Sequence, residues 1–235
     1  MTENTPDLSL VVPLYNEEEN IPDMVRDLWD ALSLESFTWE LILVDNGSSD
    51  GTARLIADCA GVHSTVRRVD VPRNLGYGWG VISGLETARG RYVGWSDGDN
   101  QVPSAVIGAA YKRAVAEDLD ICVGNPLRIG TSFSRRMVSS VYILSFNLLF
   151  LSRFRAINGK PKIMKRGIYD RLRLVSKDWF IDAEVMIKAK KLSLRTGFID
   201  FELRPREKGG SHIRLRTLFE FVRNLLHRRV IPFRF

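Results

Sequence analysis

The chain of 235 residues is poor in the features that mark disulfide-rich, zinc-binding and membrane-spanning proteins. It holds only two cysteines, Cys59 and Cys122, far apart in apolar segments, so we expect buried thiols and no disulfide. Its three histidines are scattered and predict no zinc site. No apolar run approaches the roughly 20 residues that cross a bilayer, and the polar start does not resemble a secretory signal. We therefore expect a cytoplasmic protein.

Charge is divided unevenly along the chain. Residues 1–120 hold 20 acidic and 9 basic side chains, whereas residues 121–235 hold 8 acidic and 25 basic ones. The basic half requires an anionic partner, for which nucleic acid, a membrane surface and a phosphorylated acceptor are the candidates. Nucleic acid is disfavoured because no recognition motif or aromatic platform accompanies the basic residues.

Short apolar runs alternate with helical patterns through the first hundred residues. Strands are expected at 8–13, 41–44, 66–71 and 92–95, and helices at 21–34, from 52 toward 59, and at 78–88. This alternation predicts an α/β fold in which helices cover both faces of a mostly parallel sheet. Such sheets bind ligands at the carboxyl ends of their strands. Acidic residues follow three of those ends, namely Glu17, Asp45, and the pair Asp97 and Asp99.

Two carboxylates, Asp97 and Asp99, stand one residue apart at the tip of an expected buried strand. Side chains at this spacing point the same way on an extended chain, and Gly98 between them allows close approach of a ligand. Oxygen ligands suit Mg²⁺ or Mn²⁺, which keep coordination positions for substrate phosphates, so the pair predicts a diphosphate ligand. The alternative is an ordinary turn of Asp-Gly-Asp-Asn composition.

Four motifs occur in the order and spacing of the inverting family 2 glycosyltransferases of GT-A fold. They are Pro13-Leu14-Tyr15-Asn16-Glu17, the run from Val44-Asp45-Asn46-Gly47 to Thr52, Arg73-Asn74-Leu75-Gly76, and Asp97-Gly98-Asp99. The chain most resembles the dolichyl/polyprenyl-phosphate sugar transferases, the subgroup of the dolichol-phosphate mannose synthases. The resemblance spans roughly residues 8–212, so we expect residues 1–212 to form one GT-A domain.

The resemblance implies a nucleoside-diphosphate sugar as donor and Mg²⁺ or Mn²⁺ as cofactor. Nucleotide-binding roles are implied for Pro13, Tyr15, Glu17, Asp45, Gly76 and Asp97. Metal-binding roles are implied for Asp97, Asp99 and Gln101. The sugar and the base of the nucleotide, UDP or GDP, stay open.

The basic half resembles the same family at three places. Lys160 and Lys162 are expected to contact phosphate, and Asp182 is the expected acceptor-side catalytic carboxylate. The alternative for Asp182 is that it merely favours a helix N-terminus. A loop over 204–212 resembles the segment that folds over the diphosphate and acceptor, which implies roles for catalytic Arg206 and for Ser211. The family's lysine is replaced by histidine in that loop, and Arg214 is expected to supply its charge.

These features predict metal-dependent, inverting sugar transfer to a membrane polyprenyl phosphate, dolichyl or undecaprenyl. An ionised phosphate acceptor needs no general base, whereas a glycan hydroxyl, the alternative acceptor, would need one such as Asp182. The excess of arginine in the second half favours phosphate. A processive synthase is disfavoured because the Gln-x-x-Arg-Trp signature is absent. An inactive binding module stays open, while the glycines at 76–80 lack the spacing of a dinucleotide site.

Two arginine-flanked apolar segments predict contact with a membrane surface. Residues 133–155 include a run that is too short and too polar to span, and residues 213–235 carry a basic amphipathic pattern. We therefore expect a peripheral protein on the cytoplasmic face of a membrane, as a homo-oligomer or with a membrane subunit as further options. The alternative is that these helices pack on the sheet or in a dimer interface.

Overall fold

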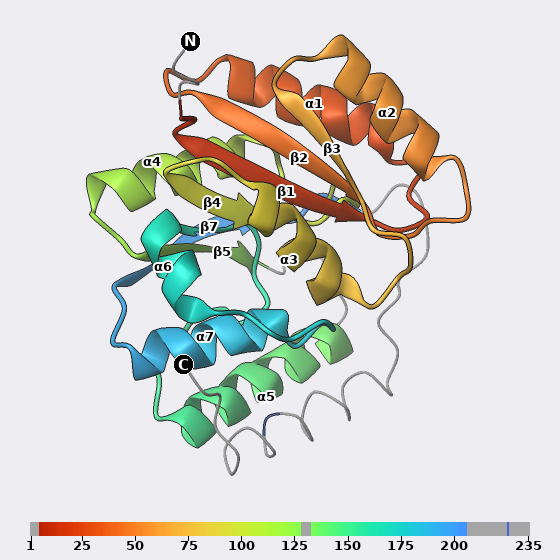
Figure 1. The fold of residues 1–235 in the computed structure, drawn as a ribbon. Coiled ribbons are helices and arrows are strands. Elements are labelled where there is room, and N and C mark those ends of the chain that lie inside the picture. The colour runs from red at the N-terminus through yellow and green to blue at the C-terminus, as the bar shows by residue number, and fades with distance from the viewer. Residues whose placement is uncertain (1–4, 128–132, 206–224, 226–235) are drawn as a thin grey trace.

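The structure, a computed structural model, describes residues 5–127, 133–205 and 225, and its ribbon is drawn in Figure 1. Seven strands of this part of the chain form one sheet: β1 (Leu8–Leu14), β2 (Trp39–Asp45), β3 (Val66–Asp70), β4 (Tyr92–Trp95), β5 (Ile121–Leu127), β6 (Lys162–Lys165) and β7 (Thr196–Glu202). The helices are α1 (Ile21–Ser33), α2 (Thr52–Val62), α3 (Tyr77–Thr87), α4 (Ala105–Ala116), α5 (Phe133–Phe150), α6 (Arg166–Leu172) and α7 (Ile181–Lys191).

The sheet has the strand order β3-β2-β1-β4-β6-β5-β7. Neighbouring strands are parallel except at β6, which runs antiparallel to both β4 and β5. The carboxyl ends of β1, β2 and β4 therefore meet at one edge, since Leu14 pairs with Asp45 and Val11 pairs with Trp95. This edge is where the acidic loops predicted from the sequence emerge.

Alternate residues of the central strands face opposite sides of the sheet, as the two-residue period of a strand requires. Leu10 and Val12 of β1 pack with helices α1, α2 and α4 in one apolar cluster. Val11, between them, packs with α3, α5, α6 and α7 in the other. Both faces are buried, which is why β1 and β2 are mostly apolar, and the buried polar side chains Ser9 and Glu40 hydrogen-bond to each other.

The predicted α/β fold is confirmed, with helices on both faces of a mostly parallel sheet (Figure 1). Strand β4 spans the same residues that the sequence predicted, and the other early elements differ by only a few residues at their ends. The antiparallel strand β6 was not anticipated. A helix does occupy the predicted segment 133–155, as α5, whereas the predicted helix at 213–235 lies almost entirely outside the described residues.

No helix among the described residues is both long enough and apolar enough to cross a bilayer. Helix α5 has apolar side chains on more than one side: Tyr142 and Phe146 are buried in the cluster that includes α7, while other apolar side chains of the helix are exposed. Those exposed side chains are Met137, Val138, Val141, Leu144 and Leu148.

The contact between α3 and the central strands depends on Gly84. A methyl group at this position would collide with the side chains of Val11 and Val44. We expect Gly84→Ala to lower the free energy of unfolding by about 1–3 kcal/mol, the usual cost of overpacking a core. Gly61→Ala is the matched control, because nothing lies within 4 Å of its added methyl, and it should stabilise α2 slightly. Urea denaturation measures both, and equal stabilities of the two variants would contradict this packing.

Candidate functional site

The loops that follow β1 and β2 are locked together at the carboxyl edge of the sheet. The backbone N–H of Asn16 donates to Ser48 Oγ (3.1 Å), and Asn16 Oδ1 accepts from the N–H of Ser49 (2.8 Å). The carboxylate of Glu18 accepts from the N–H of Gly51 (2.6 Å). Because each loop supplies hydrogen-bond partners to the other, the two loops form one unit.

A left-handed residue shapes the first of these loops. Asn16 has φ of 53°, a conformation that Asn tolerates better than most residues. Tyr15, which precedes this turn residue, is 40% exposed. Glu17 is held beside it, since its N–H donates to Thr52 Oγ1 (2.9 Å) and its carboxylate accepts from the side chain of Asn20. Tyr15 and Glu17 thus lie at the carboxyl edge of the sheet, which we call the rim, and their contact with a nucleoside stays a prediction.

Asp45 and Asn46 connect this unit to the start of α3. Asp45 Oδ1 accepts from the N–H of Ser48 (3.0 Å), and Asn46 Nδ2 donates to the carbonyl of Gly76 (3.1 Å). Gly76 has φ of 116°, and a side chain there would overlap the carbonyl of Lys177. The structure therefore brings the predicted residues Asp45 and Gly76 to adjoining loops.

Pro13 lies on the floor of the site. It is buried near the end of β1, and a methyl group on Gly80 of α3 would lie 3.1 Å from its Cβ. Its side chain is therefore covered by α3, and its predicted contact with a nucleotide stays a prediction.

The carboxylate of Asp97 is held by two side chains from other elements. Tyr77, the first residue of α3, donates its hydroxyl to Asp97 Oδ1 (2.7 Å). The ammonium of Lys160 lies 3.7 Å from the same oxygen. Asp97 itself stays one-third exposed. The first acid of the pair is therefore oriented before any ligand binds.

Tyr77 is positioned by an aromatic stack that the sequence did not suggest. Its ring lies parallel to that of Trp179, with centroids 4.2 Å apart and an interplanar angle of 8°. Burial, and then the charge of Asp97, raises the pKa of Tyr77 well above its usual value. The hydroxyl therefore keeps its proton and donates a hydrogen bond to Asp97. The one signal that could have pointed to Tyr77 is its place at the start of a glycine-rich helix beside the strand ends.

A buried ion triad lies behind Asp97. Asp182, the second residue of α7, accepts from Lys160 Nζ (2.5 Å) through one oxygen and from Lys162 Nζ (2.8 Å) through the other. The side chains of Asp182, Lys160 and Lys162 are 1%, 5% and 0% exposed. Lys162 also donates to the carbonyls of Ile157 and Gly159, so its ammonium has three acceptors. We call these three side chains the ion triad.

The charges of the ion triad determine each other's pKa. Burial alone would raise the pKa of Asp182, but the ammonium groups of Lys160 and Lys162 outweigh it and hold that pKa below its ordinary value. Burial opposes the charge of Lys160 as well, yet Asp182 and Asp97 raise its pKa. Burial lowers the pKa of Lys162 to about 8, because Asp182 compensates only in part. The triad is ionised at neutral pH.

The structure places Lys160, Lys162 and Asp182 in a more enclosed environment than their predicted roles imply. Lys162 is enclosed and fully paired, so it presents no ammonium to a phosphate in this structure. Asp182 is likewise enclosed by two lysines and offers no oxygen to an acceptor. The predicted contact of Lys160 with phosphate and the predicted base role of Asp182 stay predictions.

A second buried ion pair on α7 fixes the loop that carries Trp179. Glu184 accepts from Lys188 Nζ (2.5 Å) and from the N–H groups of Val175 and Ser176. This loop packs against the start of α3, where the N–H of Trp79 donates to the carbonyl of Lys177 (2.9 Å). Glu184, which sequence reasoning did not assign, therefore supports the stack on Tyr77 from behind.

Asp99 and Gln101 lie on the other side of the acidic loop, beside the end of β7. Asp99 Oδ1 accepts from the N–H of Gln101 (3.2 Å). The backbone N–H of Arg204 donates to the carbonyl of Gln101 (2.9 Å), and Gln101 Nε2 donates to the carbonyl of Arg204 (3.2 Å). The acidic loop is thus attached to the segment that leads toward residue 206.

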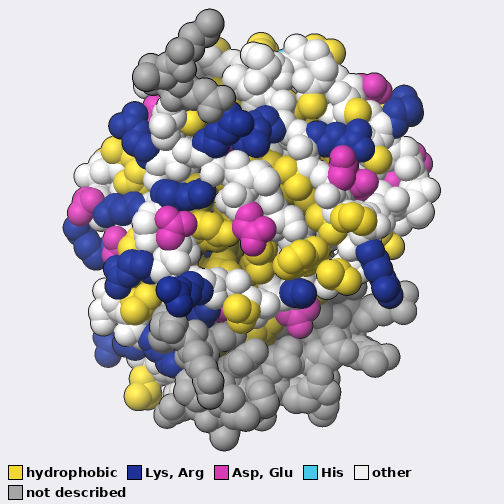
Figure 2. Space-filling view, in the orientation of Figure 1, with side chains coloured by type: hydrophobic (Ala, Val, Ile, Leu, Met, Phe, Trp, Pro, Cys, Tyr) yellow, Lys and Arg dark blue, Asp and Glu magenta, His cyan; other side chains and the backbone are white. Residues whose placement is uncertain are grey.

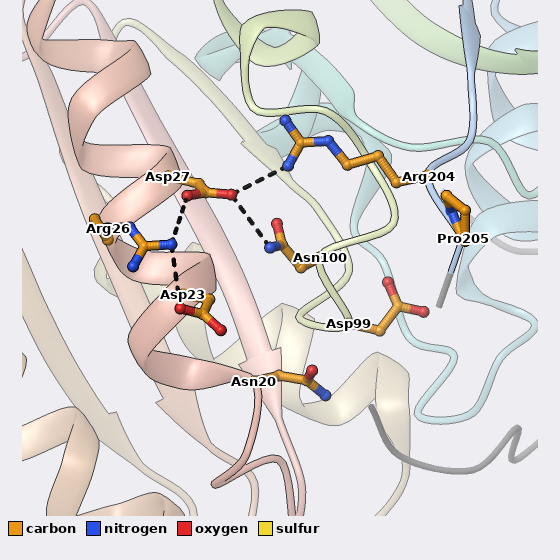
Figure 3. Close-up of a pocket in the computed structure, with 8 residues that line it drawn as sticks. All are labelled: Asn20, Asp23, Arg26, Asp27, Asp99, Asn100, Arg204 and Pro205. Atoms are coloured by element: carbon orange, nitrogen blue, oxygen red, sulfur yellow. Dashed lines mark hydrogen bonds and ion pairs between the residues drawn. The ribbon is translucent and has the colours of Figure 1, made fainter. Parts of the chain in front are cut away.

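A polar cavity of about 300 Å³ adjoins Asp99 (Figure 3). Asp27 of α1 lies in its wall and accepts hydrogen bonds from Asn100 (3.3 Å) and Arg204 (3.1 Å). Burial opposes the charge of Asp27, but Asn100, Arg26 and Arg204 hold its pKa below the usual value. The cavity is lined by Asn20, Asp23, Arg26, Asp27, Asp99, Asn100, Arg204 and Pro205. Its wall joins α1 to the acidic loop.

The donor set at the acidic loop fits a hard divalent cation. Asp97 and Asp99 supply carboxylate oxygens, and the amide of Gln101 uses its nitrogen for Arg204, which leaves its oxygen for another partner. The described residues contain no cluster of three or more His, Cys, Asp or Glu that could hold a metal. Mg²⁺ commonly takes one or two carboxylates together with substrate phosphates, which this donor set would allow.

Three predicted site residues fall outside the described part of the chain: Arg206, Ser211 and Arg214. Their roles stay predictions. The described segment ends at Pro205, next to the cavity and to the acidic loop.

Comparison with known proteins identifies a family. Residues 9–181 match the family described as Glycosyl transferase family 2. Dodecaprenyl-phosphate galacturonate synthase of Rhizobium johnstonii is 37% identical over 121 residues, which cover 50% of this chain and 35% of that protein. Dolichyl-phosphate beta-glucosyltransferase ALG5D of Trichomonas vaginalis is 23% identical over 236 residues, covering 93% of this chain and 72% of that protein. The chain thus spans only about a third of the first relative.

Solved structures share the fold. Glucosyl-3-phosphoglycerate synthase of Mycobacterium tuberculosis, crystallised with Mn²⁺, UDP and glucosyl-3-phosphoglycerate, has a TM-score of 0.71 and 17% identity to this chain. The match covers 96% of this chain and 79% of that one. At this identity the likeness establishes the GT-A fold alone.

The lowered pKa of Lys162 predicts a pH dependence of stability. A lysine of the unfolded chain titrates near about 10.4, so between about pH 8 and 10.4 the unfolded state binds more protons than the folded state. Stability contributed through Lys162 should therefore rise with pH across this window. Asp182, Lys160 and the ring of Trp95 are the charged and aromatic groups facing Lys162, and the two charged ones stay ionised there. Urea denaturation at several pH values measures the slope.

Lys162→Met should lose this rise, because it removes the titrating group. Lys165→Met is the control, since Lys165 lies on the same strand but is partly exposed, and its hydrogen bond with Asp118 raises its pKa. That variant should keep the rise. The same slope in wild type and Lys162→Met would contradict the assignment of the shifted group.

Proposed function

The chain belongs to glycosyl transferase family 2, and on this basis we propose that it transfers a sugar from a nucleoside diphosphate to a membrane polyprenyl phosphate. We propose further that the reaction inverts the anomeric carbon and requires Mg²⁺ or Mn²⁺. The names of the Rhizobium and Trichomonas relatives both specify a polyprenyl-type phosphate, which supports this acceptor class.

One observation supports a nucleoside-diphosphate sugar as the donor. The acidic loop of Asp97 and Asp99 emerges beside the interlocked loops after β1 and β2, with Asp97 already oriented by Tyr77. Tyr15 and Glu17 on the rim are suited to contact a nucleoside, and the two acids are suited to the diphosphate end. This arrangement favours a nucleotide whose base lies over the rim and whose phosphates lie at the acidic loop.

Each protein group then has a chemical task. Asp97, Asp99 and Gln101 are the residues that would hold the cation, which supplies positive charge for the departing diphosphate when it is bound. Tyr77 keeps Asp97 in place through its hydroxyl. The interlocked loops hold Tyr15 and Glu17 without rearrangement, so binding the nucleoside orders little of the protein.

The environment of Asp182 favours an acceptor that is already ionised. This carboxylate is enclosed, and each of its oxygens accepts a hydrogen bond from a lysine, so it is poorly placed to remove a proton. A lipid phosphate is an anion at neutral pH and attacks without a general base. A sugar hydroxyl on a glycan is the alternative acceptor, and it would require a base from another part of the chain.

Helix α5 supports action at a membrane surface. Five of its apolar side chains are exposed at helical spacing, from Met137 to Leu148. Basic side chains, by contrast, are spread across the face of the molecule shown in Figure 2, among acidic and hydrophobic ones. We therefore propose that the apolar stripe of α5 enters the headgroup region of the cytoplasmic leaflet, where a lipid acceptor would be found.

A thermal-shift panel tests the donor and the metal together. UDP, GDP and their sugars should raise the melting temperature more with Mn²⁺ than without it, since binding to the folded state alone stabilises by mass action. Asp99→Asn should lose the Mn²⁺-dependent part of the shift and about 10²-fold or more of the turnover, because a charged ligand near the developing negative charge is gone.

Asp58→Asn is the matched control for that panel, because Asp58 lies on the exposed surface of α2 and pairs only weakly with Arg54. It should behave as wild type. The proposed function fails if no nucleotide shifts the wild type. The metal assignment fails if Asp99→Asn keeps the Mn²⁺-dependent shift.

Liposome sedimentation tests the membrane surface. Replacing Val141, Leu144 and Leu148 by Gln should weaken binding to vesicles containing anionic lipid by about tenfold or more, since each apolar side chain that enters lipid contributes on the order of 1 kcal/mol. Leu34→Gln is the control, because Leu34 is equally apolar and exposed but lies at the end of α1. Equal losses in both variants, or no sedimentation of the wild type, would contradict this role of α5.

A further inference from the structure

Asp97 uses only one of its oxygens for contacts with the described part of the chain. The hydroxyl of Tyr77 and the ammonium of Lys160 both lie against Oδ1. No hydrogen bond or ion pair from the described residues reaches Oδ2. The carboxylate is thus held from one side, and its other oxygen remains available to a ligand.

Lys160 cannot turn away from this position without leaving one oxygen of Asp182, Oδ2, without its hydrogen bond. Its ammonium lies 2.5 Å from Asp182 and 3.7 Å from Asp97, and its side chain is 5% exposed. The carbonyl of Asn158 accepts a further hydrogen bond from it (3.3 Å). The cation beside Asp97 is therefore a fixed part of the protein.

The four charges form a row in which the sign alternates from Asp97 to Lys160, Asp182 and Lys162. Asp182 would draw Lys160 away from Asp97 if it were alone. Lys162 takes the second oxygen of Asp182 and so shares its charge. The result is that Lys160 lies between two carboxylates and offsets part of the charge of each.

We propose that Lys160, held by Asp182 and Lys162, is a positioning residue of the metal site: it fixes Asp97 through Oδ1 and weakens the attraction of this carboxylate for a second cation. This inference rests on the proposed function, because it takes Asp97 and Asp99 as the metal-binding acids. The cation is bound firmly only when phosphate oxygens complete its coordination, so it arrives and departs with the nucleotide.

The first test removes the fixed charge. Lys160→Met should bind Mn²⁺ alone about tenfold more tightly than the wild type, because the competing ammonium beside Asp97 is gone. Asp182 keeps Lys162 as its partner in this variant, so no buried charge is left unpaired. Lys165→Met is the matched control: it removes the same charge from the far end of β6 and should leave Mn²⁺ affinity unchanged. Mn²⁺ titration followed by electron paramagnetic resonance gives the affinities.

The second test keeps Lys160 but changes the two residues that hold it, Asp182 and Lys162. Asp182→Asn combined with Lys162→Met deletes one buried charge of each sign, a change that buried ion pairs often tolerate. Lys160 then keeps Asp97 as its carboxylate partner but has lost Asp182. Its ammonium should therefore pair more closely with Asp97, and Mn²⁺ should bind more weakly than in the wild type. Adding Lys160→Met to this double variant should restore tight binding. If the ion triad had a purely structural role, Lys160→Met and the double variant would not change Mn²⁺ affinity in opposite directions.

The outcomes separate this inference from the proposed function. If the wild type binds Mn²⁺ neither alone nor with UDP or GDP, the proposed metal site itself is wrong. If the wild type binds Mn²⁺ but Lys160→Met binds it no more tightly, the inference is overturned and the metal site stands. The inference is supported if Mn²⁺ affinity rises in Lys160→Met, falls in the double variant Asp182→Asn with Lys162→Met, and is unchanged in Lys165→Met.

Discussion

Burying Asp182 with two lysines is the constraint on which the geometry of the site depends. Charges withdrawn from water cost several kcal/mol each unless close partners replace the lost hydration. Here each oxygen of Asp182 and each ammonium has such partners, and Lys162 also takes the carbonyls of Ile157 and Gly159. Satisfying these charges therefore determines the path of the backbone before β6 and the distance between β6 and α7.

Helix α7 positions two separate segments of the site because its acids Asp182 and Glu184 point in different directions. Residues two apart on a helix lie roughly 200° apart around its axis. Asp182 accordingly faces the strand that carries Lys162, and Glu184 faces the loop at Val175 and Ser176. One buried helix thus sets the positions of both groups that contact Oδ1 of Asp97, Lys160 directly and Tyr77 through Trp179.

Much of the first half could be predicted from the sequence because each strand, loop and helix there has a local pattern. The acidic residues at the strand ends follow from the rule that parallel strands share one ligand-binding edge. Strand β6 could not be predicted in this way, since it has four residues and lysine at both ends. Nor could the pattern reveal whether Lys160, Lys162 and Asp182 face a ligand or each other, because burial depends on contacts between distant segments. Tyr77 was missed for the same reason.

The place of β6 in the sheet also bears on how the chain folds. Strands β4 and β5 are consecutive in sequence, yet they do not touch, because β6 lies between them. The backbone edge of β4 thus stays unpaired until residues 162–165 have been synthesised and have turned back to meet it. An open apolar edge of this kind is a site of pairing with other chains during folding. Strand β6, which brings Lys162 to Asp182, also closes that edge. A change that slows the docking of β6 onto β4 would therefore first cause aggregation during synthesis.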